Sequence, residues 1–175
     1  MMKPKLLVLL TLIPLFLTGT LLAPPEDHQP YSGSNELERM KSLVGVWSGK
    51  MDMGNGPMDI SVEYRVVAGG SAVEERTFAG TPMEMVSMYH DKEGKLAMTH
   101  YCMLHNQPAM ILESADEQSI SLEFDESCGI DVSTEAHMHA LTVTFNDDDT
   151  ITQDWTAFEA GKAIDGHPYT LTRVE

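Results

Sequence analysis

From residue 45 onward, hydrophobic and polar residues alternate with a period of two along most of the chain. The pattern is clearest over residues 59–66, 95–102, 119–125 and 137–145, where most of the residues at every second position are apolar. Alternation of this kind is typical of a strand with one face in a core and the other toward solvent. The chain therefore predicts an all-β domain of about ten short strands.

Short segments rich in Gly, Pro, Asn and Asp separate these runs. Because the runs follow one another closely with no helix between them, they predict a single closed antiparallel up-and-down β-barrel. One short helix is predicted ahead of the first strand, over about residues 36–43, with Asn35 as its N-cap and Glu38 as the capping partner. Leu37 and Met40 are expected to face inward.

The N-terminal residues predict a targeting segment. Two lysines precede an apolar run over residues 6–17, which is typical of a signal peptide. We expect residues 1–23 to be a signal peptide or membrane anchor, residues 24–35 a flexible linker, and residues 36–175 the barrel domain. Export to the periplasm or the extracellular space follows from this leader. Contact with the membrane is expected only through an uncleaved leader.

Composition narrows the class of partner. The formal net charge is -16 at pH 7, with 11 basic against 27 acidic residues. Such a chain is repelled by phosphate backbones, so no nucleic-acid partner is expected. The chain has two cysteines, Cys102 and Cys128. An oxidising compartment would allow them to pair, and both the paired and the free state stay open.

A resemblance to a known family rests on both ends of the predicted barrel. Gly45-Val46-Trp47 follows the predicted helix, and Arg173 shares a face of the last predicted strand with Leu171. With the meander between them, these features resemble the lipocalin-like (calycin-type) barrels, among them exported bacterial domains of uncharacterised function. The resemblance implies a barrel around a small ligand, with Trp47 and Arg173 in a structural role at its closed end.

Several polar residues fall on the apolar faces of predicted strands. In an up-and-down barrel the end of 95–102 and the start of 137–145 lie opposite Trp47. An apolar lumen with a few converging polar groups is what a small-molecule site requires. The predicted ligand-binding residues are His100, Cys102, His137, His139, Gln153 and Tyr64.

The predicted function is therefore to hold a small apolar or amphipathic ligand in the lumen. The alternative is a transition-metal or haem-binding barrel, with His100, His137 and His139 as candidate ligands. His167 is a further haem candidate, because nitrobindin-type haem barrels also use a histidine late in the chain. The cofactor is left unassigned.

The sequence favours a binding protein over an enzyme. It contains neither a G-x-S-x-G motif nor a glycine-rich phosphate loop. Two adjacent acids, Glu74 and Glu75, are interpreted as a solvated pair on a strand.

Overall fold

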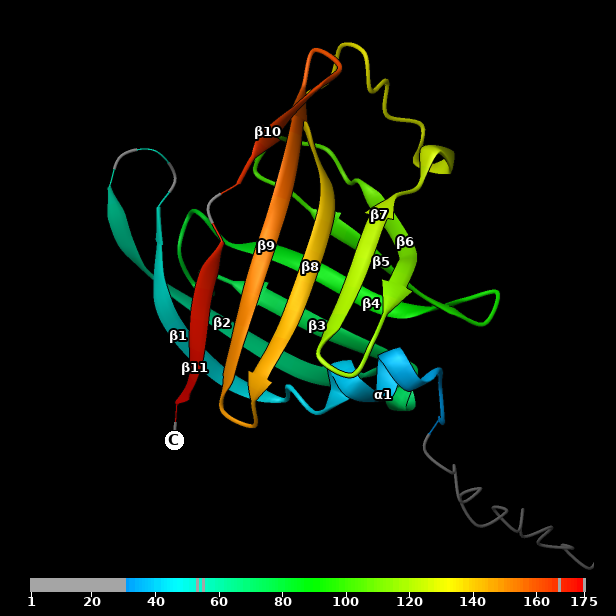
Figure 1. The fold of residues 1–175 in the computed structure, drawn as a ribbon, viewed down its shortest axis with the longest axis vertical. Helices are drawn as coiled ribbons and strands as arrows, with labels where there is room; N and C mark the ends of the chain where they lie inside the picture. The colour runs from blue at the N-terminus through cyan, green and yellow to red at the C-terminus, as the bar shows by residue number, and fades with distance from the viewer. Residues whose placement is uncertain (1–30, 53, 55, 167, 175) are drawn as a thin grey trace, which may run out of the picture.

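The computed structural model describes residues 31–175 except 53, 55, 167 and 175. It is a closed antiparallel barrel of ten strands with one extra strand and a single short helix, as the alternation predicts (Figure 1). The elements are α1 (Asn35–Lys41), β1 (Gly45–Asp52), β2 (Pro57–Val67), β3 (Ala72–Thr77), β4 (Met85–Lys92), β5 (Lys95–Tyr101), β6 (Ala109–Ala115), β7 (Ser119–Phe124), β8 (His137–Asp147), β9 (Thr150–Glu159), β10 (Lys162–Asp165) and β11 (Tyr169–Val174).

The strands form an up-and-down meander. Each strand from β1 to β8 pairs antiparallel with the next along the chain, and β11 lies between β9 and β1 and closes the barrel. β10 and β11 pair with successive parts of β9, at residues 156–159 and 150–153. Gly166 lies between these two strands, where a Cβ atom would come within 1.9 Å of the Trp155 carbonyl oxygen. Only glycine fits this crossing without a shift of the backbone.

The interior of the barrel is lined mainly by apolar side chains from the inward positions of the strands. α1 lies across one end of the barrel and adds Leu37 and Met40 to the core. The fully buried apolar side chains include Trp47, Ile60, Tyr64, Tyr89, Leu96, Met98, Met110, Ile120 and Leu122.

The helix begins one residue earlier than the sequence predicts. Its N-cap is Ser34 rather than Asn35, because the Ser34 hydroxyl accepts a hydrogen bond from the Leu37 N–H at 3.1 Å. The same hydroxyl donates to Asp91 Oδ1 of β4 at 2.7 Å. One serine thus caps the helix and ties it to the barrel wall.

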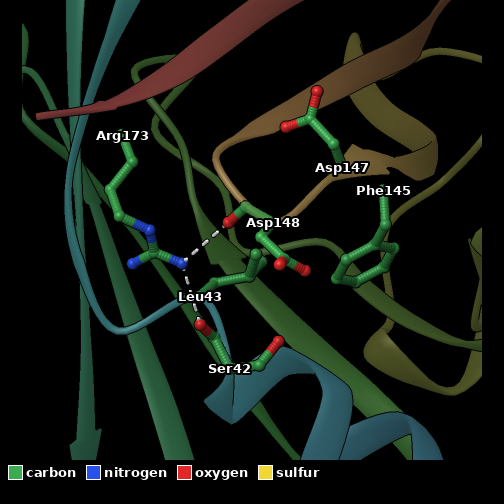
Figure 2. Close-up of a pocket in the computed structure, with 6 residues that line it drawn as sticks. All are labelled: Ser42, Leu43, Phe145, Asp147, Asp148 and Arg173. Atoms are coloured by element: carbon green, nitrogen blue, oxygen red, sulfur yellow. Dashed lines mark hydrogen bonds between the residues drawn. The ribbon is translucent and has the colours of Figure 1, made fainter.

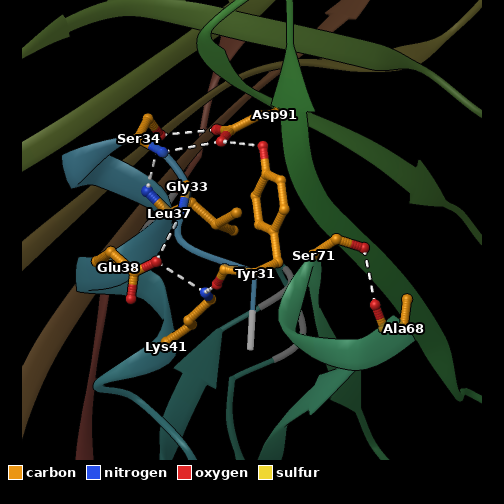
Figure 3. A network of polar contacts seen from close by, with 9 residues as sticks. All are labelled: Tyr31, Gly33, Ser34, Leu37, Glu38, Lys41, Ala68, Ser71 and Asp91. Atoms are coloured by element: carbon orange, nitrogen blue, oxygen red, sulfur yellow. Dashed lines mark hydrogen bonds and ion pairs between the residues drawn. The ribbon is translucent and has the colours of Figure 1, made fainter. Parts of the chain in front are cut away.

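Residues 31–34 belong to the folded domain, although the sequence assigns them to a flexible linker. The Tyr31 hydroxyl donates to Asp91 Oδ2 at 3.2 Å, and the Gly33 N–H donates to Glu38 Oε1 at 2.9 Å (Figure 3). The expected leader and the rest of the linker, residues 1–30, lie outside the described residues. No helix in the described part of the chain is long and apolar enough to cross a membrane.

Trp47 and Arg173 close the end of the barrel beside the helix. The Trp47 indole N–H donates to the Leu43 carbonyl at 2.7 Å, and the side chain is fully buried. The Arg173 guanidinium lies 4.3 Å from the centre of the indole ring and donates to the Val44 carbonyl at 2.7 Å. A cation over an aromatic face adds electrostatic attraction to the packing. We call this end the floor of the barrel.

Candidate functional site

Two polar side chains, Glu75 and Gln153, lie at the centre of a hydrogen-bonded cluster inside the barrel. Glu75 is 1% exposed on β3, and Gln153 is fully buried on β9. Along β3 the alternation places Glu75 on the buried face, while Glu74 pairs with Arg65 on the outer surface. The interpretation of Glu74 and Glu75 as a solvated pair is therefore wrong for Glu75.

The side-chain amide of Gln153 uses its whole hydrogen-bonding capacity. Its Oε1 accepts from the Tyr169 hydroxyl at 2.6 Å and from the Trp155 indole N–H at 3.0 Å. Its Nε2 donates to the Tyr64 hydroxyl at 2.6 Å and to Glu75 Oε2 at 3.0 Å. Because a primary amide offers two donors and two acceptor positions, these four partners fix its orientation.

Glu75 is surrounded by donors. Its Oε2 also accepts from the Tyr89 hydroxyl at 2.8 Å, whereas its Oε1 has, among the described residues, only the Thr77 hydroxyl at 3.4 Å. Burial raises the pKa of Glu75, and its hydrogen bonds, that from Tyr89 foremost, partly offset this effect. Burial also raises the pKa of Tyr64 and of Tyr89 well above the usual value, and the charge of Glu75 adds to the shift. One carboxyl oxygen is left with a weak partner inside the lumen.

His100 extends this cluster along β5. It is 4% exposed, its Nδ1 lies 3.0 Å from the Ser87 hydroxyl, and its ring centre lies 4.9 Å from that of Trp155. Burial lowers the pKa of His100 to about 4, so the imidazole is neutral at pH 7. The structure therefore brings Tyr64, His100 and Gln153 of the predicted set together, and adds Glu75, Tyr89 and Tyr169. We call these six residues the lumen cluster.

The buried imidazole of His100 predicts a loss of stability in acid. Its pKa is about 4 in the folded protein and 6.5 in the unfolded chain, so the unfolded state binds more protons between these values. Between pH 7 and pH 5 the free energy of unfolding should fall by about 2 kcal/mol more in the unmodified protein than in His100→Gln, whose side chain at this position cannot titrate. Urea unfolding of both proteins at the two pH values measures this difference. An identical pH dependence in the two proteins would show that His100 is not buried as a neutral ring.

His137 and His139 form a separate cluster at the end of the barrel opposite the floor, where β8 begins (Figure 1). A bulge between Met138 and Ala140 interrupts the pairing with β9. The extra residue shifts the pairing register at this point, so alternation alone does not place both histidines on the face of Leu141. The rings instead pack with two aromatic side chains: His137 is fully buried, and His139 stacks on Phe158 at 3.7 Å and on Phe124 at 5.0 Å.

A chain of polar contacts links the two imidazoles. His137 Nδ1 lies 2.8 Å from the Glu135 carbonyl, His137 Nε2 lies 2.9 Å from His139 Nδ1, and His139 Nε2 lies 3.2 Å from Glu123 Oε1. Burial lowers the pKa of His139, and the neighbouring His137 adds to the shift. Burial and the charge of Glu113 raise the pKa of Glu123. The facing nitrogens of the two rings are thus engaged with each other.

The candidate metal ligands do not converge. His100 belongs to the lumen cluster, whereas His137 and His139 contact each other in the aromatic cluster. Within residues 31–175, leaving out the four undescribed positions, no group of three or more His, Cys, Asp or Glu side chains is arranged to hold a metal ion. His167, the further haem candidate, lies outside the described residues.

Both cysteines are free thiols in the structure. Cys102 follows the end of β5 in a turn, where its N–H donates to the Asn106 carbonyl at 3.1 Å, and Cys128 ends a short 3-10 helix over Glu126–Cys128. Burial raises the pKa of the half-buried Cys102 thiol. Cys102 thus lies outside the strand on which the alternation places it, and its role as a ligand-binding residue stays a prediction.

A pocket of about 420 Å³ opens at the floor rather than in the lumen (Figure 2). Arg173 spans it by donating to the Ser42 carbonyl at 3.1 Å and to the Asp148 carbonyl at 3.4 Å. The Arg173 guanidinium thus donates to backbone carbonyls of both the β8–β9 turn and the end of the helix, and so links these two segments. The residues that line the pocket are Ser42, Leu43, Phe145, Asp147, Asp148 and Arg173.

Comparison with known proteins supports the fold. No family model matches the chain, and no curated protein matches its sequence. A protein of unknown function from the DUF3598 family of Nostoc punctiforme has a similar structure, with a TM-score of 0.53 and 11% identity over 83% of this chain. The chain spans about half of that protein, 51% of its length.

A second solved structure covers a similar share of the chain. The M. tuberculosis protein Rv2717c has a TM-score of 0.52 and 16% identity over 82% of this chain and 100% of its own. At these identities the likeness establishes the fold alone. By its fold, the chain is similar to closed antiparallel β-barrels of ten strands.

Proposed function

We propose that the protein binds a small apolar or amphipathic molecule inside the barrel, with the polar end of that molecule held by the lumen cluster. The observation that carries the proposal is the convergence of polar side chains on one buried carboxyl. Tyr89 and Gln153 donate to Glu75 from two other strands, and Tyr64 accepts from the same Gln153 amide, within a lumen that is mainly apolar. This composition is typical of a small-molecule site.

The energetics of Glu75 argue against a purely structural role. Removing a carboxyl group from water is unfavourable, and replacing buried charged groups by well-packed apolar residues is often neutral or stabilising. A barrel that only had to fill its interior would be served better by a leucine at this position. Buried groups with strongly shifted pKa values are concentrated at functional sites, which supports a role in binding.

The predicted export is part of the same proposal. A secreted binding barrel requires the leader that residues 1–23 predict. N-terminal sequencing of the protein recovered from the periplasm or medium should begin after this segment, whereas an intact Met1 on soluble cytoplasmic protein would contradict export.

Titration of the full chain with 1-octanol tests the binding function. We expect saturable 1:1 binding by calorimetry, because the eight-carbon tail can lie against the apolar wall while the hydroxyl reaches the lumen cluster. Amide NMR shifts should concentrate on Tyr64, Tyr89 and Gln153. Tyr169→Phe removes one hydroxyl from the cluster and should weaken octanol binding. The matched control is Thr170→Ala, on the exposed face of the same strand, which should leave octanol binding unchanged.

Two results would overturn the proposal. One is the absence of saturable binding by octanol and by other eight-carbon probes. The other is binding whose NMR shifts concentrate on Ser42 and Asp148, because that result would place the ligand in the floor pocket instead of the lumen.

A further inference from the structure

The described part of the lumen contains a carboxyl group without a cationic side chain to pair with it. Glu75 is the one carboxyl side chain buried in the described part of the chain, where no lysine or arginine is buried. The basic side chains that contact acids do so on the surface, as in the Arg65–Glu74 and Lys92–Asp125 pairs. Any negative charge on Glu75 is therefore balanced by hydrogen bonds alone.

The hydrogen bonds to Glu75 are unevenly divided between its two carboxyl oxygens. Tyr89 and Gln153 donate to Oε2, whereas within the part of the chain that the structure describes Oε1 accepts from the Thr77 hydroxyl alone, at 3.4 Å. A carboxylate accepts up to four hydrogen bonds, so Oε1 has capacity left for a strong donor. A ligand that itself only accepts would leave this oxygen without a partner.

Resting on the proposed function, we propose that the lumen selects ligands whose polar end is a primary or secondary ammonium group. An ammonium group supplies both the missing positive charge and the N–H donors for Glu75 Oε1, and charge-assisted hydrogen bonds of this type are short and strong. A carboxylate ligand would bring a second negative charge beside Glu75, where like charges disfavour each other. The neutral ring of His100 offers no compensating charge.

A set of ligands with one tail and four polar ends separates these contributions. Octylamine, octyltrimethylammonium, 1-octanol and octanoate are titrated into the full chain by calorimetry at pH 7.5, below their micelle-forming concentrations. We expect octylamine to bind at least tenfold more tightly than octanol, and octanoate to bind most weakly. Octyltrimethylammonium should bind less tightly than octylamine, because it carries the charge without an N–H donor.

Glu75→Gln assigns the preference to one residue. The amide has the shape of the carboxyl but cannot carry its negative charge, so the ratio of octylamine affinity to octanol affinity should fall at least tenfold. Glu74→Gln is the matched control, because it removes the neighbouring acid from the outer face and should leave both affinities unchanged. The comparison of ligands on the unmodified protein stands even where a variant folds poorly.

The outcomes distinguish the two proposals. If none of the four molecules binds, the proposed function fails. If octanol binds but octanoate binds as tightly as octylamine, or if Glu75→Gln keeps the preference for octylamine, the lumen holds ligands without selecting an ammonium group, and this inference is overturned while the proposed function stands.

Discussion

Replacing Gln153 by leucine should destabilise the folded protein by about 4 kcal/mol, although the two side chains have similar volumes. The substitution removes four hydrogen bonds at once. Tyr169 and Trp155 lose the acceptor for their O–H and N–H groups, and Glu75 loses a donor to its Oε2. Each buried polar group left without a partner costs about 1–3 kcal/mol, and the apolar gain of leucine recovers part of the total.

Urea unfolding of Gln153→Leu against the unmodified chain measures this loss. Asp154→Asn is the matched control, because Asp154 is the next residue on β9 and is exposed, so its substitution should change stability by less than about 0.5 kcal/mol. Equal stability of Gln153→Leu and the unmodified chain would mean that the amide does not organise the interior of the barrel.

Replacing Trp47 by alanine should cost about 3–5 kcal/mol, because it deletes the largest buried side chain at the floor. The loss includes the hydrogen bond to the Leu43 carbonyl and the surface on which Arg173 lies. It also removes the edge contact with Tyr64, whose ring centre is 6.5 Å away at 86°. The floor and the lumen cluster are therefore in direct contact through these two rings.

Two further variants separate the parts of this effect. Trp47→Phe keeps an aromatic ring and loses the N–H donor, so we expect a loss of about 1–2 kcal/mol. Val46→Ala changes the neighbouring residue on the outer face, which is 42% exposed, and should have little effect. Thermal unfolding of the three variants should rank them in this order. A Trp47→Ala protein as stable as Val46→Ala would contradict a packed floor.

The fold could be predicted because burial on one face repeats every second residue. Strands such as Ser119–Phe124 bury Ile120, Leu122 and Phe124 and leave the residues between them more exposed, which is the pattern of the sequence. The same reasoning located Tyr64, His100 and Gln153, since each is a polar or amphipathic residue in the register of apolar neighbours. These three lie together in the lumen cluster.

Glu75 was missed because two glutamates stand side by side, and adjacent charges are usually solvated. Its position two residues from Val73 was the available signal, since both residues fall on one face of a strand. The pairing of Glu75 with Tyr64 across β2 and β3 places both side chains on the buried face, and this register is set by the whole sheet.

The positions of His137 and His139 could not be read from alternation. A β-bulge adds a residue to one strand without changing the local sequence pattern, so the rule that every second residue lies on the same face no longer holds across the bulge. The helix cap shows a smaller version of the same difficulty. Ser34 and Asn35 are both good N-caps, and the contact of Ser34 with Asp91, a residue distant in the sequence, accompanies the choice of Ser34.

Glu75 lies inside the barrel as an ionisable group removed from water. Carboxyl ¹³C NMR of the full chain, with the Glu75 signal assigned by its loss in Glu75→Gln, follows the titration of this one residue. We predict a midpoint above the ordinary value of 4.5, because burial opposes ionisation. A midpoint at or below 4.5 would place Glu75 in solvent or beside a positive charge and would show that it is not buried in the lumen as described.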